Sequence, residues 1–317
     1  MFIQIVLLVL GFIILIKGAD IFVDGASSIA GNFKVSKMLI GLTIVAFGTS
    51  APEFAVSVKS IISNNHDIVL GNVIGSNILN ILLILGVSSL FHSLSVKDAT
   101  VKKELPIMLL ITTLFAVLMS DTLYDKNLTN AFTRSDGVVT TLFFLVFIYY
   151  LVSVMRNKID SDSDEKYMPM IKAWIYTIGG IIAIIIGSNF VVDSASKIAT
   201  MIGISEKLIS LTIIALGTSL PELVTSVTAT RKGEYDIAIG NVIGSNIFNI
   251  GIVIGVPITL FGGINQINFN LIDVIVMVLS AFLLFFFASN DKKISKYEGI
   301  IFLALFVIYY SYVIYLG

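Results

Sequence analysis

The sequence predicts an all-α membrane protein with ten transmembrane helices arranged as two inverted five-helix repeats. Three observations support this prediction. The 317 residues are 56% hydrophobic and 13% charged, with a mean hydropathy of +0.98, whereas soluble domains carry about 25% charged residues. Ten apolar segments are long enough to cross a bilayer. Motifs of the first half recur in the second half at one constant offset.

We place the spans by the lengths of the apolar runs and by the charged residues that separate them. The predicted spans are 2–24, 38–60, 68–91, 104–120, 136–155, 171–193, 207–230, 237–261, 271–289 and 298–316. The first span lacks a basic N-terminal region and a small-residue cleavage pattern, so we interpret it as a membrane helix and not as a signal peptide. The polar stretch "RNKIDSDSDEKYM", 156–168, is interpreted as a solvated linker.

Three sequence blocks repeat at an offset of 169 residues. "GLTIVAFGTSAPEFAVSV" (41–58) shares 11 of 18 residues with 210–227, and "IVLGNVIGSNILNI" (68–81) shares 11 of 14 with 237–250. "GADIFVDGASSIA" (18–30) also pairs with 187–199. A constant offset indicates a duplicated unit. We therefore expect a first repeat at 1–155, a cytoplasmic linker at 156–170 and a second repeat at 171–317.

Each repeat holds five spans, and an odd number turns the second copy over in the membrane, as in many secondary transporters. With the N-terminus outside, 14 Lys and Arg residues fall on the inner face and 5 on the outer face. This positive-inside bias predicts a multi-pass protein of the cell membrane with both termini extracellular. The net charge of −1 gives no basic surface for nucleic acid, and the absence of cysteine excludes thiolate metal sites.

The repeated "GTS-x-PE" block predicts a break in the second span of each repeat. Pro52 and Pro221 have no N–H to donate, so the carbonyls of Gly48 and Gly217 lose their helical partner. A bare carbonyl in hydrocarbon costs several kcal/mol, so it needs water, a side chain or a cation. Glu53 follows Pro52 directly. Acidic residues within membrane spans are rare and usually functional.

The oxygen-bearing residues of the two repeats occupy equivalent positions. Thr49, Ser50 and Glu53 share one helix face, and Thr218, Ser219 and Glu222 repeat them. The next span carries a polar stripe at i, i+4 and i+8, formed by Asn72, Ser76 and Asn80 and repeated by Asn241, Ser245 and Asn249. Such oxygens select hard cations such as Ca²⁺, Na⁺ or Mg²⁺. We expect the broken helices to meet at an ion site.

Other polar residues receive a structural interpretation. Asp24 and Asp193 fall at span ends, where they can cap helices or remain hydrated. His66 and His92 lie near span ends and are interpreted as loop or interfacial residues, with proton sensing as an alternative. Taken alone, each Pro is more simply explained by a helix kink, and each Ser or Asn by a helix-packing contact. The buried acid and its duplication favour a functional interpretation.

The paired motifs "GTSAPE…GNVIGSN" and "GTSLPE…GNVIGSN" resemble the alpha repeats of the calcium/cation antiporter superfamily, and most of all prokaryotic sodium/calcium exchangers. The resemblance covers essentially the whole chain. It implies Ca²⁺ and Na⁺ as transported ions, no cofactor, alternating access, and three Na⁺ exchanged per Ca²⁺. We expect the chain to act as a monomer in the lipid bilayer.

The resemblance also assigns roles by position. Glu53 and Glu222 match the central calcium carboxylates, and Thr49 and Thr218 match residues that lend backbone carbonyls to calcium. Ala46 and Ala215 match backbone sodium ligands; the matching hydroxyl sodium ligands are Ser50, Ser76, Ser219 and Ser245. Asn80 matches a polar residue at the centre of the site. Asn249 departs from the acid that relatives often carry there, which argues against potassium cotransport and lowers the charge of the site.

Three other functions are weighed against this one. The first is Ca²⁺/H⁺ exchange on the same scaffold, because desolvated carboxylates accept protons readily. The second is an intramembrane metal-dependent enzyme, for which the sequence has neither H-E-x-x-H nor G-x-S-x-G. The third is a passive channel, which would leak Ca²⁺ without a counter-ion. We expect an antiporter and not an enzyme.

Overall fold

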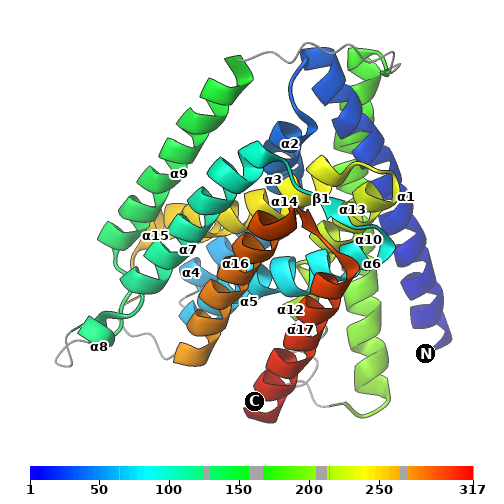
Figure 1. The fold of residues 1–317 in the computed structure, drawn as a ribbon. Coiled ribbons are helices and arrows are strands. Elements are labelled where there is room, and N and C mark those ends of the chain that lie inside the picture. Colours follow the sequence, from blue (N-terminus) through cyan, green and yellow to red (C-terminus); the bar gives the residue numbers. More distant parts are fainter. Residues whose placement is uncertain are drawn as a thin grey trace.

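A computed structural model describes residues 1–63, 65–124, 129–156, 167–204, 213, 215–264 and 270–316. The described residues form a bundle of helices of very different lengths (Figure 1). Two helices, α1 (Phe2–Phe33) and α10 (Met170–Met201), are 32 residues long and lie side by side at one edge of the bundle.

Several of the remaining helices are interrupted by π-helical turns (η). The first half continues with α2 (Lys37–Ile40), η1 (Gly41–Val45), α3 (Ala46–Thr49), α4 (Ala51–Ile62), α5 (His66–Leu79), η2 (Asn80–Leu85), α6 (Gly86–Phe91), β1 (Leu94–Ser95), η3 (Thr100–Glu104), α7 (Leu105–Leu118), α8 (Asp121–Tyr124) and α9 (Arg134–Arg156). The second half, after α10, contains α12 (Ala215–Gly217), α13 (Leu220–Arg231), α14 (Tyr235–Phe248), η5 (Asn249–Ile254), α15 (Gly255–Phe261), α16 (Leu271–Asp291), β2 (Lys293–Ile294) and α17 (Lys296–Leu316).

Seven helices of the described residues are long and apolar enough to cross a membrane, or eight if the bent pair Lys37–Thr49 and Ala51–Ile62 is one span. All of them coincide with predicted spans. Predicted span 104–120 does not qualify. Its helix α7 has 14 residues, and the turn η3 before it carries the charged residues Lys102, Lys103 and Glu104. Predicted span 207–230 does not qualify either, and most of its first part lies outside the described residues. The count of ten therefore stays a prediction.

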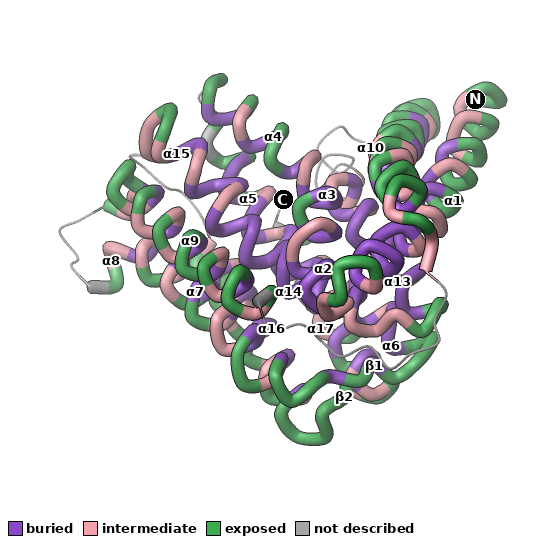
Figure 2. Tube along the Cα trace, turned by 90° about the horizontal axis from the view of Figure 1, so that it is seen from above, coloured by how far each residue is buried: buried purple, intermediate pink, exposed green. Residues whose placement is uncertain are grey.

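Burial ranks the helices from the centre of the bundle outward (Figure 2). In the helix Tyr235–Phe261, 94% of the most apolar stretch is buried, and in Asp67–Phe91 the share is 72%. The corresponding share is 22% for α1 and 11% for α17, so these two present most of their apolar residues outward, as lipid-facing helices do. The two central helices are those that carry the "GNVIGSN" motifs.

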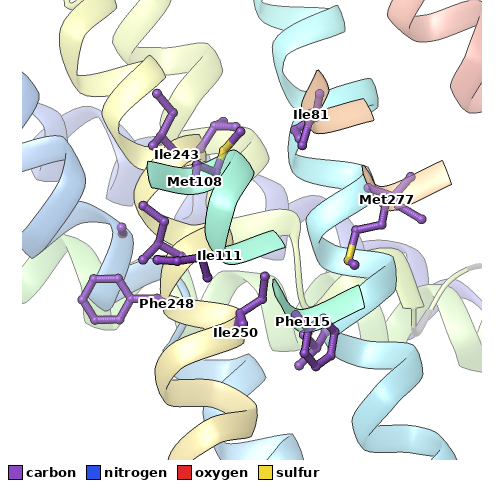
Figure 3. Packing of buried hydrophobic residues seen from close by; sticks show 14 of the residues in the cluster. Ile81, Met108, Ile111, Phe115, Ile243, Phe248, Ile250 and Met277 are labelled. Atoms are coloured by element: carbon purple, nitrogen blue, oxygen red, sulfur yellow. The ribbon is translucent and has the colours of Figure 1, made fainter. Parts of the chain in front are cut away.

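The centre is packed by side chains from both halves of the chain. Figure 3 shows Ile243, Phe248 and Ile250 of α14 and η5 beside residues of α7, and Met277 of α16 on the side of Ile81. Phe115 of α7 is fully buried and packs edge-on against Phe132 at 5.4 Å between ring centroids. Close packing of this kind makes the central helices a rigid support for polar groups placed between them.

Helices α1 and α10 pack antiparallel through glycines. A Cβ on Gly18 would lie 2.9 Å from the backbone nitrogen of Ile184, and a Cβ on Gly187 would lie 2.6 Å from that of Leu15. The 169-residue offset turns one contact into the other, because it maps 18 onto 187 and 15 onto 184. Contacts that occur in exchanged pairs are the mark of packing about a two-fold axis.

Two short β-links, absent from the all-α prediction, also join the halves. Strands β1 and β2 pair antiparallel, with Leu94 opposite Ile294, and an isolated antiparallel bridge joins Phe132 to Ile264. Leu94 follows the third predicted span of its repeat, as Ile264 does, whereas Phe132 and Ile294 both follow the fourth. Strands of two residues give no periodic sequence signal, which is why the sequence did not predict them.

We predict opposite outcomes for two neighbouring glycines of α10. A Cβ on Gly180 would lie 2.6 Å from Cβ of Phe22, whereas a Cβ on Gly179 would meet nothing within 4 Å. Gly180→Ala should destabilise the protein by about 1–3 kcal/mol through overpacking, and Gly179→Ala should be neutral or slightly stabilising. The apparent Tm of the purified protein in detergent measures both. Equal melting of the two variants would contradict the packing described for α1 and α10.

Candidate functional site

The second predicted span of each repeat is broken beside its proline. Helix α3 ends at Thr49 and α4 begins at Ala51, and the two parts of this span are bent by 46°. In the second half α12 ends at Gly217 and α13 begins at Leu220. Ser50 and Ser219 occupy the breaks with almost the same backbone angles, φ −81° and ψ 6° against φ −89° and ψ 3°. The breaks therefore fall where the two "GTS-x-PE" motifs predict them.

Glu53 and Glu222 lie in the first turns of α4 and α13, and each is only 1% exposed. The positive end of a helix dipole favours a negative charge there. Ser50 Oγ donates a hydrogen bond of 3.1 Å to Glu222 Oε1, so the break of one repeat contacts the acid of the other.

Among the described residues, no cationic side chain compensates the two acids. Oε2 of Glu53 and Oε2 of Glu222 are buried and have no hydrogen-bond partner, and neither acid takes part in an ion pair of the described residues. An unpaired buried carboxylate is strongly unfavourable. The arrangement therefore needs positive charge from outside the chain.

Asn72 and Asn241 hold the broken segments in place. Nδ2 of Asn72 donates to the carbonyl of Glu53 at 3.1 Å, and Nδ2 of Asn241 donates to the carbonyl of Glu222 at 3.5 Å. Across the repeats, Thr49 Oγ1 donates to Asn241 Oδ1 at 3.0 Å and Thr218 Oγ1 donates to Asn72 Oδ1 at 3.5 Å. Both asparagines were recognised in the polar stripe but were not predicted as site residues.

The serines of the stripe lie at the same junction. Ser219 Oγ donates to Ser76 Oγ at 3.3 Å, and Ser245 Oγ donates to Asn241 Oδ1 at 3.5 Å. Ser50, Ser76, Ser219 and Ser245 are all buried. Of these four hydroxyl groups, that of Ser50 contacts a carboxylate directly, and the other three bond to polar groups of the two motifs.

One turn further along, Asn80 and Asn249 are the first residues of the π-helical turns η2 and η5. Each is 1% exposed and has a buried Oδ1 without a partner. Their Nδ2 groups donate across the repeats, from Asn80 to Asn246 Oδ1 at 2.9 Å and from Asn249 to Asn77 Oδ1 at 3.1 Å. Asn77 and Asn246 were not predicted. The signal in the sequence that could have identified them was the second asparagine of each "GNVIGSN" motif.

Two predicted residues contribute only their backbone. Ala46 is buried, and its carbonyl accepts from Ser50 N–H at 3.0 Å and from Thr49 Oγ1 at 3.4 Å. Ala215 begins α12, and its side chain lies outside the described residues.

The donor set consists of oxygen alone. The described residues contain no cluster of three or more His, Cys, Asp and Glu side chains, so hydroxyl, amide and backbone oxygens must complete any coordination shell around the two acids. Ca²⁺ accepts six to eight such oxygens. Of the two histidines, His92 ends α6 and its ring lies 6.4 Å from that of Tyr235, away from these groups; the side chain of His66 is not described.

A multi-span helical protein with two buried, uncompensated carboxylates in an all-oxygen setting is a membrane transporter for hard cations. The chain belongs to the sodium/calcium exchanger protein family, whose model matches residues 3–153 and 172–315. Members of this family are transporters and not enzymes; Ca²⁺ and Na⁺ are cargo, and no cofactor is required.

Relatives and solved structures agree with this assignment. The chain is 36% identical to the putative antiporter CaxA of Alkalimonas amylolytica over 98% of both chains. It is 34% identical to the sodium/calcium exchanger MaX1 of Methanosarcina acetivorans over 95% of both. A structure of the sodium-calcium exchanger NCX_Mj soaked with Na⁺ and Sr²⁺ matches with a TM-score of 0.84 and 35% identity, over 97% of both chains.

The uncompensated acids lead to a prediction about stability without ions. In buffer free of Na⁺ and divalent cations, Glu53→Gln and Glu222→Gln should each raise the apparent Tm, because each removes a buried charge that lacks a partner. Asp291→Asn, which neutralises an exposed acid, is the control and should leave Tm nearly unchanged. A lower Tm for both glutamine variants would indicate that the carboxylates are already compensated within the protein.

Proposed function

We propose that this protein is a secondary active antiporter that exchanges Ca²⁺ for Na⁺ across the cell membrane by alternating access. The observation that carries the proposal is the pair of buried acids, Glu53 and Glu222, each with an unpartnered oxygen. The sodium/calcium exchangers among its relatives and solved structures support the choice of ions.

The charges of the site favour exchange over leak. With both acids ionised the pocket carries −2, so one Ca²⁺, two Na⁺ or two protons bring it to zero and three Na⁺ leave it at +1. An empty pocket of two desolvated carboxylates is costly, which discourages movement of the unloaded carrier. A ratio of three Na⁺ to one Ca²⁺ would move net charge and gain about 2.3 kcal/mol per charge per 100 mV.

The ligands we propose are those of the two broken spans and the polar stripes. Ca²⁺ binds between the carboxylates of Glu53 and Glu222, with backbone carbonyls of Thr49 and Thr218. Na⁺ is held by backbone oxygens and hydroxyl groups, and the amide oxygens of Asn80 and Asn249 line the centre. The proposed sodium ligands are Ala46, Ala215, Ser50, Ser76, Ser219 and Ser245.

The proposed architecture is ten spans in two inverted repeats, 1–155 and 171–317, joined by the linker 156–170. Three observations support it: the antiparallel packing of α1 on α10, the contacts that exchange under the 169-residue offset, and a family match in two segments. We further propose that both termini lie outside the cell, which rests on the distribution of Lys and Arg. We also propose that the protein acts as a monomer.

Ca²⁺/H⁺ exchange is the second candidate. Two protons neutralise the two carboxylates as well as two Na⁺ do, and the relative CaxA is named only as an antiporter. The two candidates share the calcium site and differ in the counter-ion alone.

An asymmetry between the repeats suggests which way the transporter faces. Helix α1 packs along α13, whereas α10 makes no comparable contact with α4, the equivalent of α13. Lys232 Nζ, after α13, donates to Asp24 Oδ1 of α1 at 2.7 Å, and Glu234 accepts from Ser27 Oγ of α1 at 2.8 Å. The first repeat has Ser63 and Asn65 at the equivalents of Lys232 and Glu234 and has no such charges.

We propose that these contacts, which we call the α1 clamp (Asp24, Ser27, Lys232 and Glu234), hold one side of the transporter closed. By the Lys and Arg distribution this is the cytoplasmic side, so the structure corresponds to an outward-facing arrangement. Movement of α1 and α10 against the other helices would then open the opposite side in turn.

The counter-ion is tested by Ca²⁺ uptake into proteoliposomes of the purified protein. A sodium gradient should drive uptake, replacement of Na⁺ by choline at fixed pH should stop it, and an imposed voltage should change its rate. Uptake that ignores sodium and follows a pH gradient would select the proton exchanger, and Ca²⁺ leak without any counter-ion would indicate a channel.

In the same assay, Glu53→Gln and Glu222→Gln should each abolish Ca²⁺ transport, because one remaining carboxylate cannot neutralise the divalent ion. Asp291→Asn serves as the transport control and should retain the wild-type rate. Either glutamine variant that moved Ca²⁺ with normal affinity would remove that acid from the proposed site.

The α1 clamp gives a prediction about sidedness. Lys232→Ala removes a partly exposed ion pair worth about 0.2–1 kcal/mol, so it should change the ratio of apparent Ca²⁺ affinities on the two faces by up to about fivefold, with tighter binding from the clamp side. Lys102→Ala removes an exposed pair with Asp98 and is the control. An unchanged ratio in Lys232→Ala would show that the clamp does not bias the transporter.

A further inference from the structure

The two asparagines with free Oδ1 atoms, Asn80 and Asn249, are each held by another asparagine of the opposite repeat. Asn80 Nδ2 donates to Asn246 Oδ1 at 2.9 Å, and Asn249 Nδ2 donates to Asn77 Oδ1 at 3.1 Å. The 169-residue offset maps 77 onto 246 and 80 onto 249, so the two hydrogen bonds are exchanged copies of each other. All four side chains are at most 1% exposed.

The orientation of the Asn246 and Asn77 amides is set by the groups that their Nδ2 atoms contact. Asn246 Nδ2 donates to the backbone carbonyl of Asn77 at 3.4 Å and faces Met108 Sδ at 3.8 Å. A carbonyl and a thioether can only accept. Asn246 must therefore present its Oδ1 to Asn80, which in turn must present its Nδ2.

The mirrored arrangement holds for the second pair. Asn77 Nδ2 faces Met277 Sδ at 4.0 Å, and Met277 is the offset equivalent of Met108. Both methionines are fully or almost fully buried in the packed centre drawn in Figure 3. Asn77 therefore directs its Oδ1 to Asn249, and Asn249 in turn must present its Nδ2 to Asn77.

The consequence is that Asn80 and Asn249 have only one way to place their amide oxygens. With Nδ2 engaged across the repeat, each Oδ1 stays buried and unpartnered. Asn80 lies one helical turn after Ser76 and Asn249 one turn after Ser245, on the stripes that reach the two acids. An amide free to rotate could instead turn its NH₂ group, a donor, toward a cation.

We propose that Asn77 and Asn246 are positioning residues that lock the amides of Asn249 and Asn80 with their carbonyl oxygens toward the transported cation. The inference rests on the proposed function, because it concerns the same pocket. It assigns to the second asparagine of each "GNVIGSN" motif a role in cation affinity and not only in helix packing. The pairing is crossed: each asparagine acts on the opposite repeat.

The test measures equilibrium Ca²⁺ binding to the purified full chain by calorimetry. Asn77→Leu keeps nearly the same volume and removes the acceptor for Asn249, and Asn246→Leu does the same for Asn80; Ala variants at both positions form a second series. Each variant should weaken Ca²⁺ binding about tenfold, the effect expected for the loss of one fixed hydrogen bond beside a charge. Thr140→Val removes a buried hydroxyl of α9 and is the control, with unchanged affinity.

Partner specificity separates positioning from a general effect on the fold. In an Asn249→Ala background, Asn77→Leu should cause no further loss of affinity, whereas in an Asn80→Ala background it should again cause about a tenfold loss. The reverse pattern should hold for Asn246→Leu. A structural role alone would give the same loss in both backgrounds.

Unchanged affinity in the Leu and Ala variants, or equal losses in both backgrounds, would overturn the proposal while the wild type still binds Ca²⁺. Failure of all variants at Asn77 and Asn246 to yield monodisperse protein would assign these residues to the fold and would also overturn it. A wild-type protein that binds no Ca²⁺ would overturn both this inference and the proposed function.

Discussion

Two carboxylates held out of water without a counter-charge are the constraint on which the rest of this structure depends. Glu53 and Glu222 lie at the starts of two helices and are 1% exposed, and each has an oxygen that no group of the described residues satisfies. Soluble proteins pair or hydrate such groups. Here the neighbours are hydroxyl and amide groups, which can coordinate a cation but cannot replace its charge. In the proposed function, a transported cation supplies the missing charge.

The duplicated sequence explains how such a site can be built. Contacts across the molecule occur in exchanged pairs: Thr49 with Asn241 and Thr218 with Asn72, or Gly18 with Ile184 and Gly187 with Leu15. A two-fold relation brings equivalent residues together at the axis, so one inherited motif supplies both halves of the pocket. The α1 clamp is the exception, because the first repeat has no counterparts of Lys232 and Glu234. In the proposed function, that departure from symmetry holds one side of the transporter closed.

Much of this could be predicted from the sequence for clear physical reasons. A buried acid after a proline violates local rules for a membrane helix, and its repetition at a fixed offset made Glu53 and Glu222 recognisable. The crossed bonds of Asn77 and Asn246 could not be predicted, because they join residues 172 and 166 positions apart in sequence along directions set by packing. The β-links at Leu94 and Phe132 are too short to show periodicity. Span 104–120 stays a prediction: its helix α7 has 14 residues and follows the charged turn η3.

The most direct test of the central claim is anomalous scattering from crystals of this protein soaked in Sr²⁺ as a stand-in for Ca²⁺. The account predicts one strong peak between Glu53 and Glu222, in direct coordination with carboxylate oxygens of both, as Ca²⁺ is bound by carboxylates. A peak only at exposed acids, or a pocket that stays empty while the ion binds elsewhere, would contradict it.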